Sequence, residues 1–264
     1  MKAFRLVCCF LLVPVISATA AEQQLQIAAA ADLQFVFLDL SARFQKETGH
    51  AIELTFGSSG NFFSQIQNGA PFDMFFSADV DYPGKLEAAG LVEPGTLSRY
   101  ATGTVVLWSR KDSLIDVRRG LQTLVDNRVR RISIANPDYA PYGRAAVAAL
   151  RREEIYDKIR NKLVLGENIS QAAQFVESGN ADIGILALSL AVAPPLKSKG
   201  IYYEIPTNLY PPIDQAVVIL KSSKHKDIAR QFLTFLKRPD IAEVMRTNGL
   251  NVPESQPQQR KARP

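Results

Sequence analysis

The chain has very few residues suited to covalent or redox chemistry. Its only cysteines are Cys8 and Cys9, and its only histidines are His50 and His225. No G-x-S-x-G, H-E-x-x-H, P-loop or G-x-G-x-x-G motif occurs in it. A Ser-His-Asp arrangement requires a histidine near a serine and an aspartate, and neither of these two isolated histidines lies in a motif of that kind. The sequence therefore gives no argument for catalysis, and we expect no catalytic residue and no cofactor.

The first twenty residues resemble a secretory signal. Lys2 and Arg5 precede an apolar stretch at 6–16, and residues 18–20 (Ala-Thr-Ala) are small, as a cleavage site requires. The apolar stretch is too short to cross a bilayer as a stable helix. We expect cleavage near Ala20 and a soluble periplasmic protein. Both cysteines leave with the signal, so the mature chain has no disulfide. A retained anchor and a lipoprotein are the alternatives.

The charge balance does not favour nucleic acid as a partner. The formal net charge is +5 for the whole chain and falls to +3 once Lys2 and Arg5 are removed. Much of the remainder lies in a polar segment at 253–264, which we expect to be a disordered basic tail. Basic residues do not alternate with aromatic ones, as they do in many nucleic-acid surfaces.

Short apolar runs alternate with longer amphipathic ones, a pattern typical of an α/β protein with parallel strands. In the helix expected at 33–46, we place Phe35, Leu38, Leu40 and Phe44 on or near the inner face. The expected strands are 25–30, 52–56, 74–77, 100–109, 131–135, 162–165, 183–186 and 215–220. The expected helices are 33–46, 62–68, 80–89, 143–152, 154–161, 170–178, 225–236 and 239–247.

Two sets of β-α units with a long strand between them predict two parallel-sheet lobes joined by two crossovers. We expect residues 1–20 to be the signal peptide, 21–103 and 217–252 to form lobe 1, and 104–216 to form lobe 2. The ligand cleft of such a fold lies between the lobes, at the carboxyl ends of the strands.

Two stretches of small residues, 28–33 and 56–61, connect a strand to a helix in the first lobe. A helix start has unpaired N–H groups and the positive end of the helix dipole, so it suits an anion. Ser58 and Ser59 add hydroxyl donors, and neither stretch contains Lys or Arg. Together they predict a small oxyanion site without ion pairs. Taken singly, each turn is better explained as an ordinary helix cap.

The second lobe has two similar connections. Residues 136–143 follow one expected strand and place Tyr142 at a helix start, and residues 167–170 place Ile169 at another. Taken alone, Tyr142 is equally well explained as a core or hinge aromatic. Four such turns, two from each half of the chain, favour a binding protein.

At this point the chain resembles the periplasmic molybdate-binding proteins of ABC transporters. The likeness runs from residue 25 to 252 and is carried by the segments 28–33, 56–61, 65–78 and 140–143. Its most specific parts are the turn at 68–71 that leads into 77–79, and the Ala-Pro-Tyr-Gly stretch at 140–143. It implies a two-lobed protein that closes on molybdate or tungstate and delivers it to an ABC permease in the inner membrane. We expect a monomer with a small oxyanion ligand and no metal cation.

The resemblance also implies a set of ligand contacts. Backbone N–H groups would come from the turn at Ala31 and Asp32, and from Tyr142 and Ile169 in the other lobe. Ser59 would donate its hydroxyl and N–H. A tyrosine that reaches the anion in one branch is replaced here by Ala187. The expected oxyanion site is therefore Ala31, Asp32, Ser58, Ser59, Tyr142 and Ile169.

Asp32 departs from the pattern, because relatives have Ser or Asn there. A carboxylate beside a dianion costs on the order of several kcal/mol when both are charged and dry. Three accounts are open. Asp32 caps the helix beginning at Leu33 and offers only its N–H, or it accepts from a protonated oxyanion, or it is itself protonated in the closed cleft.

Three other functions stay open on the residues. One is a binding protein for a protonated oxyanion such as hydrogen phosphate. Another is a periplasmic enzyme on the same scaffold, for which only Asp32 and Tyr142 are available in the cleft. The third is a receptor module that presents its ligand-bound form to a sensor protein.

Overall fold

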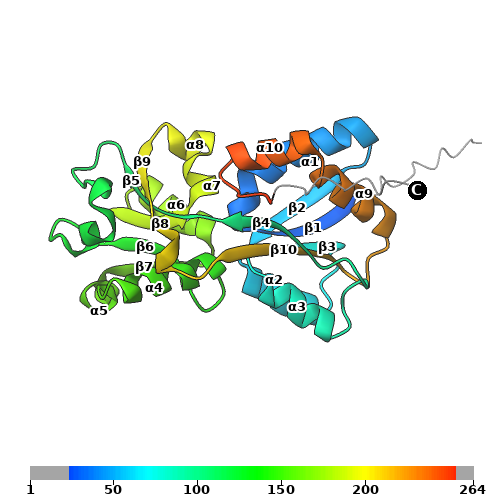
Figure 1. The fold of residues 1–264 in the computed structure, drawn as a ribbon, viewed down its shortest axis with the longest axis horizontal. Helices are drawn as coiled ribbons and strands as arrows, with labels where there is room; N and C mark the ends of the chain where they lie inside the picture. Colours follow the sequence, from blue (N-terminus) through cyan, green and yellow to red (C-terminus); the bar gives the residue numbers. More distant parts are fainter. Residues whose placement is uncertain (1–23, 254–264) are drawn as a thin grey trace, which may run out of the picture.

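The computed structural model describes residues 24–253, and these form two lobes, each built on a five-stranded sheet (Figure 1). The expected signal peptide and residues 254–264 of the expected tail lie outside the described residues. No helix among residues 24–253 is long and apolar enough to cross a membrane.

The first lobe has the strand order β2-β1-β3-β10-β4. Strands β1, β2 and β3 are parallel, and β10 pairs antiparallel with both β3 and β4. Helices α1, α9 and α10 pack on one face of this sheet, and α2 and α3 cover the other (Figure 1). The strands are β1 (Leu25–Ala30), β2 (Ile52–Gly57), β3 (Met74–Ser77), β4 (Ser98–Gly103) and β10 (Ile213–Ile219), and the helices are α1 (Gln34–Thr48), α2 (Ser59–Gln67), α3 (Asp81–Ala88), α9 (Lys226–Leu236) and α10 (Pro239–Thr247).

The second lobe has the order β7-β6-β8-β5-β9. Here β6, β7 and β8 are parallel, whereas β5 runs antiparallel to β8 and β9. The strands are β5 (Val105–Arg110), β6 (Ile132–Ala135), β7 (Leu163–Gly166), β8 (Ile183–Ala187) and β9 (Gly200–Glu204), and the helices are α4 (Pro141–Arg152), α5 (Tyr156–Ile159), α6 (Ile169–Glu177), α7 (Leu188–Ala191) and α8 (Pro194–Lys197). Each sheet is therefore mixed, because β10 in the first sheet and β5 in the second run antiparallel to both of their neighbours.

The long strand expected at 100–109 is two strands. β4 ends at Gly103 in the first sheet and β5 begins at Val105 in the second, so the chain changes lobes at Thr104. It returns through β10, which lies wholly in the first sheet from Ile213 onward. The expected lobe boundary at 216/217 therefore falls inside a strand. A continuous apolar run does not reveal this, because strands of both sheets are equally apolar.

Edge-to-face aromatic contacts fill the core of the first lobe. Phe37 packs against Phe76 with ring centroids 4.9 Å apart, and Phe44 packs against Phe232 at 5.2 Å. The inner face of α1 differs from the expectation at two positions. Phe35 is half-buried and packs against the core of the second lobe. Leu38 is 51% exposed, and the neighbouring Phe37 is fully buried in its place. Phe37 and Phe44 lie two helical turns apart, so they share the face that the sheet covers.

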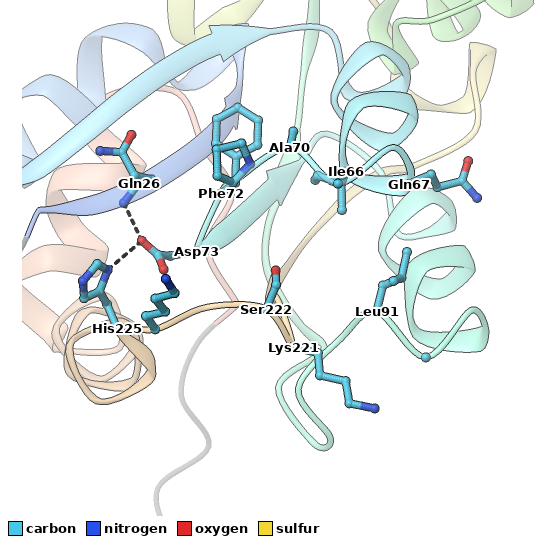
Figure 2. A pocket seen from close by; sticks show the side chains of 14 residues that line it. Gln26, Ile66, Gln67, Ala70, Phe72, Asp73, Leu91, Lys221, Ser222 and His225 are labelled. Carbon is cyan, nitrogen blue, oxygen red and sulfur yellow. Dashed lines mark hydrogen bonds and ion pairs between the residues drawn. The ribbon is translucent and has the colours of Figure 1, made fainter.

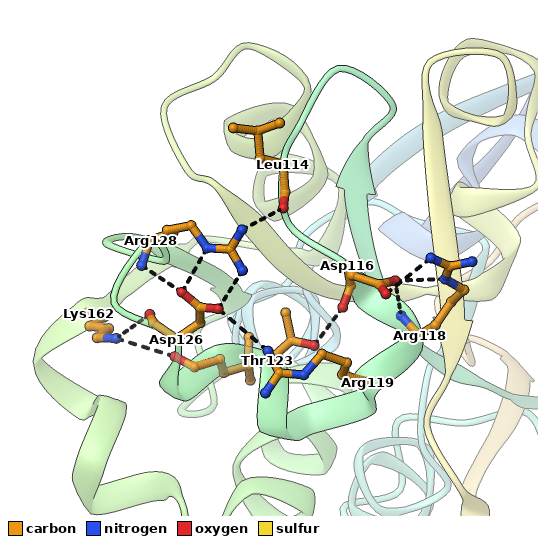
Figure 3. Close-up of polar contacts among 9 residues, drawn as sticks. Leu114, Asp116, Arg118, Arg119, Thr123, Asp126, Arg128 and Lys162 are labelled. Carbon is orange, nitrogen blue, oxygen red and sulfur yellow. Dashed lines mark hydrogen bonds and ion pairs between the residues drawn. The ribbon is translucent and has the colours of Figure 1, made fainter.

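Ion pairs and carbonyl contacts hold the irregular segment after β5, which includes the 3₁₀ helix η2 (Val117–Val125) (Figure 3). Asp126 receives a two-pronged contact from Arg128 at 3.0 and 2.7 Å, which holds the pKa of its carboxyl well below the ordinary range. Lys162 donates to the backbone oxygens of Leu124 and Asp126. Arg128 is therefore engaged by a carboxylate of its own lobe.

Strand β9 was not expected from the sequence, and it covers the single tryptophan. Gly200, the first residue of β9, is buried, and a Cβ placed on it would overlap the fully buried ring of Trp108. We predict that Gly200→Ala lowers the free energy of unfolding by about 1–3 kcal/mol, as overpacking typically does. Thermal or urea unfolding measures this.

Gly84→Ala is the matched control, because Gly84 lies inside α3 and has open space around its Cα. Helix propensity predicts an unchanged or slightly higher stability for that variant. Equal melting temperatures for Gly200→Ala and the unchanged protein would contradict the packing of β9 on Trp108.

Candidate functional site

Four strand-to-helix connections, two from each lobe, meet around one small cavity of about 10 Å3. They follow β1, β2, β6 and β7, at the carboxyl ends of these strands. All six residues predicted for the oxyanion site line this cavity. Its lining is Ala30, Ala31, Asp32, Gly57, Ser58, Ser59, Ala78, Ala140, Pro141, Tyr142, Asn168 and Ile169.

The two serines of the first lobe present their hydroxyls differently. Ser58 is the N-cap of α2, yet its side chain makes no capping bond, and its buried Oγ has no hydrogen-bond partner within residues 24–253. Ser59 Oγ accepts from the Ala78 N–H at 2.9 Å. A hydroxyl has one proton to donate, so both serines retain a donor for a ligand.

The second lobe contributes backbone N–H groups. Ala140 is the N-cap of α4 and Pro141 is its first residue, so the next N–H, that of Tyr142, lies in the first turn, where no carbonyl of the helix can reach it. In α6, the side chain of Asn168 accepts from the second and third N–H groups, at 3.0 Å each. The first N–H, from Ile169, is left over. Both helix starts therefore have a backbone donor available at the cavity.

No Lys, Arg or His lines the cavity. Its electrostatics come from the positive ends of α2, α4 and α6 and from hydroxyl dipoles. Such an arrangement suits an anion held by neutral donors.

Asp32 is the exception to this neutral lining. Its side chain is 1% exposed, and its Oδ2 accepts from Tyr142 Oη at 3.0 Å and from Gln215 Nε2 at 2.6 Å. Its Oδ1 has no partner among the described residues. Burial raises the pKa of this carboxyl from the ordinary 3.8 to about 6, although the bonds from Gln215 and Tyr142 oppose the rise.

The capping account of Asp32 is wrong. Asp32 lies within the 3₁₀ helix η1 (Ala31–Leu33), and neither η1 nor α1 has a side-chain cap. Instead, the carboxylate accepts hydrogen bonds from Tyr142 of the second lobe and from Gln215 of the crossover strand β10. Two strong donors from outside the turn replace the local N–H groups that a cap would use.

The hydroxyl of Tyr142 therefore has a structural role that the sequence did not indicate. It donates to Asp32 and accepts from Gln215 Nε2 at 3.1 Å. Burial and the nearby carboxylate raise the pKa of this phenol well above its ordinary value, so it remains a donor. Gly103 makes room for it, because a Cβ there would overlap Tyr142 Oη.

Gln215 and Ser189 also belong to the site, and sequence reasoning missed both. Gln215 is fully buried in β10, and Ser189 Oγ donates to the backbone oxygen of Asp32 at 2.8 Å. The only signal for Gln215 is a polar amide directly before the apolar run at 216–220. Ala187, which stands where one branch has a tyrosine, ends β8 and does not line the cavity.

The lobes are in contact around the cavity, so this is a closed state. Further hydrogen bonds join them beyond the contacts of Asp32. They are Gly60 N–H to Tyr139 O (2.9 Å), Asn61 to Glu167 (3.0 Å), Ser170 to Gln34 (2.6 Å) and the ion pair of Arg144 with Asp79.

A larger cavity, about 590 Å3, lies at the other end of the first sheet and is a poorer candidate (Figure 2). Asp73 at its edge already accepts from the Gln26 N–H at 2.8 Å and from Ser223 Oγ at 2.7 Å, and it contacts His225 Nδ1 at 3.1 Å. These bonds tie the ends of β1, β3 and β10 together. Both oxygens of Asp73 are thus used structurally.

Comparisons with known proteins agree with this architecture. The family model described as bacterial extracellular solute-binding protein matches residues 25–251. The molybdate-binding protein ModA of Azotobacter vinelandii is 39% identical over 89% of this chain and 92% of its own length, and that of Rhodobacter capsulatus is 36% identical over 87% and 89%.

Solved structures confirm the two-lobed periplasmic binding protein fold. The Azotobacter vinelandii periplasmic molybdate-binding protein superposes with a TM-score of 0.82 at 37% identity, covering 87% of this chain and 100% of that one. The sulfate-binding protein SubI of Mycobacterium tuberculosis has a TM-score of 0.70 at 14% identity, over 88% of each chain, which shows a shared fold only.

The raised pKa of Asp32 predicts a pH-dependent stability. Between about pH 4 and pH 6 the folded protein binds more protons at Asp32 than the unfolded chain does, so stability falls as pH rises through this window. We predict that Asp32→Asn raises the free energy of unfolding at pH 7 by up to about 3 kcal/mol, at 1.36 kcal/mol per pH unit, and changes it little at pH 4. Urea unfolding at both pH values measures this.

Asp214→Asn is the matched control, because Asp214 lies on β10 beside Gln215 and pairs instead with Arg99 and Thr102. That variant should gain no stability at pH 7. Equal stability of Asp32→Asn and the unchanged protein at pH 7 would mean that the ligand-free protein in solution does not bury Asp32.

Proposed function

Because this chain belongs to the family of bacterial extracellular solute-binding proteins, we propose that it binds a tetrahedral oxyanion for an ABC importer. Molybdate or tungstate is the proposed ligand, since the molybdate-binding proteins of two bacteria are 39% and 36% identical to this chain over the aligned residues. The observation that carries the proposal is the small interlobe cavity, where four helix-start turns supply donors and no basic residue is present.

The proposed ligand contacts are the six residues predicted from the sequence. Ser58 and Ser59 would donate hydroxyls, and Tyr142 and Ile169 would donate backbone N–H groups from the opposite lobe. The turn at Ala31 and Asp32 completes the set. Donors from both lobes explain why the ligand would favour the closed state, since only that state brings all of them together.

The chemistry at the cavity supports binding rather than turnover. The two titratable side chains that line it, Asp32 and Tyr142, are hydrogen-bonded to each other, and no histidine, cysteine or lysine lines the cavity beside them. We propose that the protein acts as a monomer without a cofactor. In this role it would work in the periplasm, after cleavage near Ala20, and pass its ligand to an inner-membrane permease.

We predict discrimination by size among dianions of equal charge. Molybdate and tungstate should bind tightly and sulfate poorly, because hydrogen-bond strength falls when fixed donors are mis-spaced around a smaller anion. Calorimetric titration of the mature protein with each anion at equal ionic strength measures this. Equal affinity for sulfate and molybdate would refute the size argument.

Ser58 offers a clean test of a proposed ligand contact. Its Oγ has no partner in the described part of the chain, so Ser58→Ala should leave thermal stability unchanged. It should weaken molybdate binding by about 1.5–3 kcal/mol, the range for a hydrogen bond to a charged group. Ser59→Ala is less clean, because it also leaves the Ala78 N–H unpaired.

Ser109→Ala is the matched control for Ser58→Ala. Ser109 is fully buried in β5, and its Oγ also lacks a partner within residues 24–253, but it does not line the cavity. This variant should keep its molybdate affinity. A similar loss in both variants would mean that the effect of Ser58→Ala is not a ligand contact.

A further inference from the structure

The inference concerns the charge state of the loaded cleft and rests on the proposed function. We infer that Asp32 is a neutral acid when the oxyanion is bound, and that its Oδ1–H donates a hydrogen bond to the anion. Each dianion that binds at neutral or alkaline pH therefore brings one proton from solvent into the cleft.

The two oxygens of Asp32 have different surroundings. Oδ2 accepts from two neutral donors, Tyr142 Oη and Gln215 Nε2, which come from the second lobe and from the crossover strand. Oδ1 is buried and has no partner among residues 24–253, although Asp32 lines the cavity proposed for the anion. A buried acceptor without a donor is unfavourable, so protonation of Asp32 is most stabilising at Oδ1.

A bound dianion makes the charged form of Asp32 still less favourable. The oxygens of the dianion can only accept hydrogen bonds. The Oδ1 of an ionised Asp32 can also only accept, so no hydrogen bond forms between Asp32 and the anion. One proton on Oδ1 converts this repulsion into an O–H···O⁻ bond of the strong, charge-assisted kind. The net charge of Asp32 plus a dianion then falls from −3 to −2, and the proton comes from solvent.

The groups that face Asp32 do not supply a compensating positive charge. Its hydrogen-bond partners are Tyr142 from α4, Gln215 from β10 and Ser189 from α7, all of them neutral. Tyr100 of β4 is also buried nearby, and its raised pKa keeps it neutral.

Arg144, a basic residue at the interface of the lobes, is already paired. Asp79 binds Arg144 across the lobes, so that guanidinium is committed to another carboxylate. Burial raises the pKa of Asp32 to about 6 even in the empty closed cleft. An anion at the cavity would raise it further.

The test is to count protons during binding. Titration calorimetry of the mature protein with molybdate, repeated in buffers of different ionisation enthalpy, gives the number of protons taken up per anion. We expect close to one proton at pH 8 and close to none at pH 5, where Asp32 already holds its proton. Affinity should fall up to tenfold for each pH unit above the pKa of Asp32 in the empty protein.

Asp32→Asn identifies the group responsible. Its amide presents one acceptor and one donor end, as a protonated acid does, without titrating. We expect this variant to bind molybdate without proton uptake at either pH and with an affinity that does not change between pH 5 and pH 8. Asp214→Asn, the control on the same crossover strand, should still take up about one proton at pH 8.

Two results would overturn the inference. One is a wild-type protein that binds molybdate at pH 8 without taking up a proton, and the other is proton uptake that survives in Asp32→Asn. Failure of the proposed function is a separate result, because in that case neither molybdate nor tungstate produces binding heat at any pH, in any of the three proteins.

Discussion

The hydrogen bonds among Asp32, Tyr142 and Gln215 join three parts of the molecule that the chain visits at widely separated points. Asp32 comes from the first lobe, Tyr142 from the second and Gln215 from the returning crossover strand. All three side chains are almost fully buried, so each bond forms in a low dielectric and its loss would leave a buried polar atom unpaired. The closed state of the lobes brings these three groups together.

Other features of the cleft follow from accommodating that contact. Gly103 ends β4 without a side chain, because the Tyr142 hydroxyl occupies the space that a Cβ would need. The chain then changes lobes at Thr104, beside Val105, whose N–H donates to Tyr210 Oη at 3.2 Å. The two crossovers are therefore joined to each other by a hydrogen bond close to the point where the chain changes lobes.

The groups that line the cleft and could stabilise an anion are neutral. Helix starts and hydroxyls supply partial positive charge without a basic side chain, and the proton that we infer on Asp32 would remove the one negative charge from the lining. A basic residue would attract anions of every size by charge alone, whereas fixed dipoles reward correct spacing. A site built in this way favours selectivity over raw electrostatic attraction.

The local features were predictable from the sequence. Strand-to-helix turns depend on a few consecutive residues, so the turns at 28–33, 56–61, 140–143 and 167–170 were visible in the sequence, and the family resemblance picked six residues in them that all line one cavity. The alternation of apolar runs predicted the α/β class and the two lobes. Periodicity also predicted most helices, although Leu38, which was expected on the inner face of α1, is exposed and Phe37 is buried instead.

Only the tertiary structure decided what Asp32 does. Its partners lie 110 and 183 residues along the chain, and no local pattern encodes such distances. The division of 100–109 into strands of two sheets and the addition of β9 were hidden for the same reason. Capping and periodicity are local and are written in neighbouring residues, whereas strand pairing and buried polar contacts depend on which distant surfaces pack together.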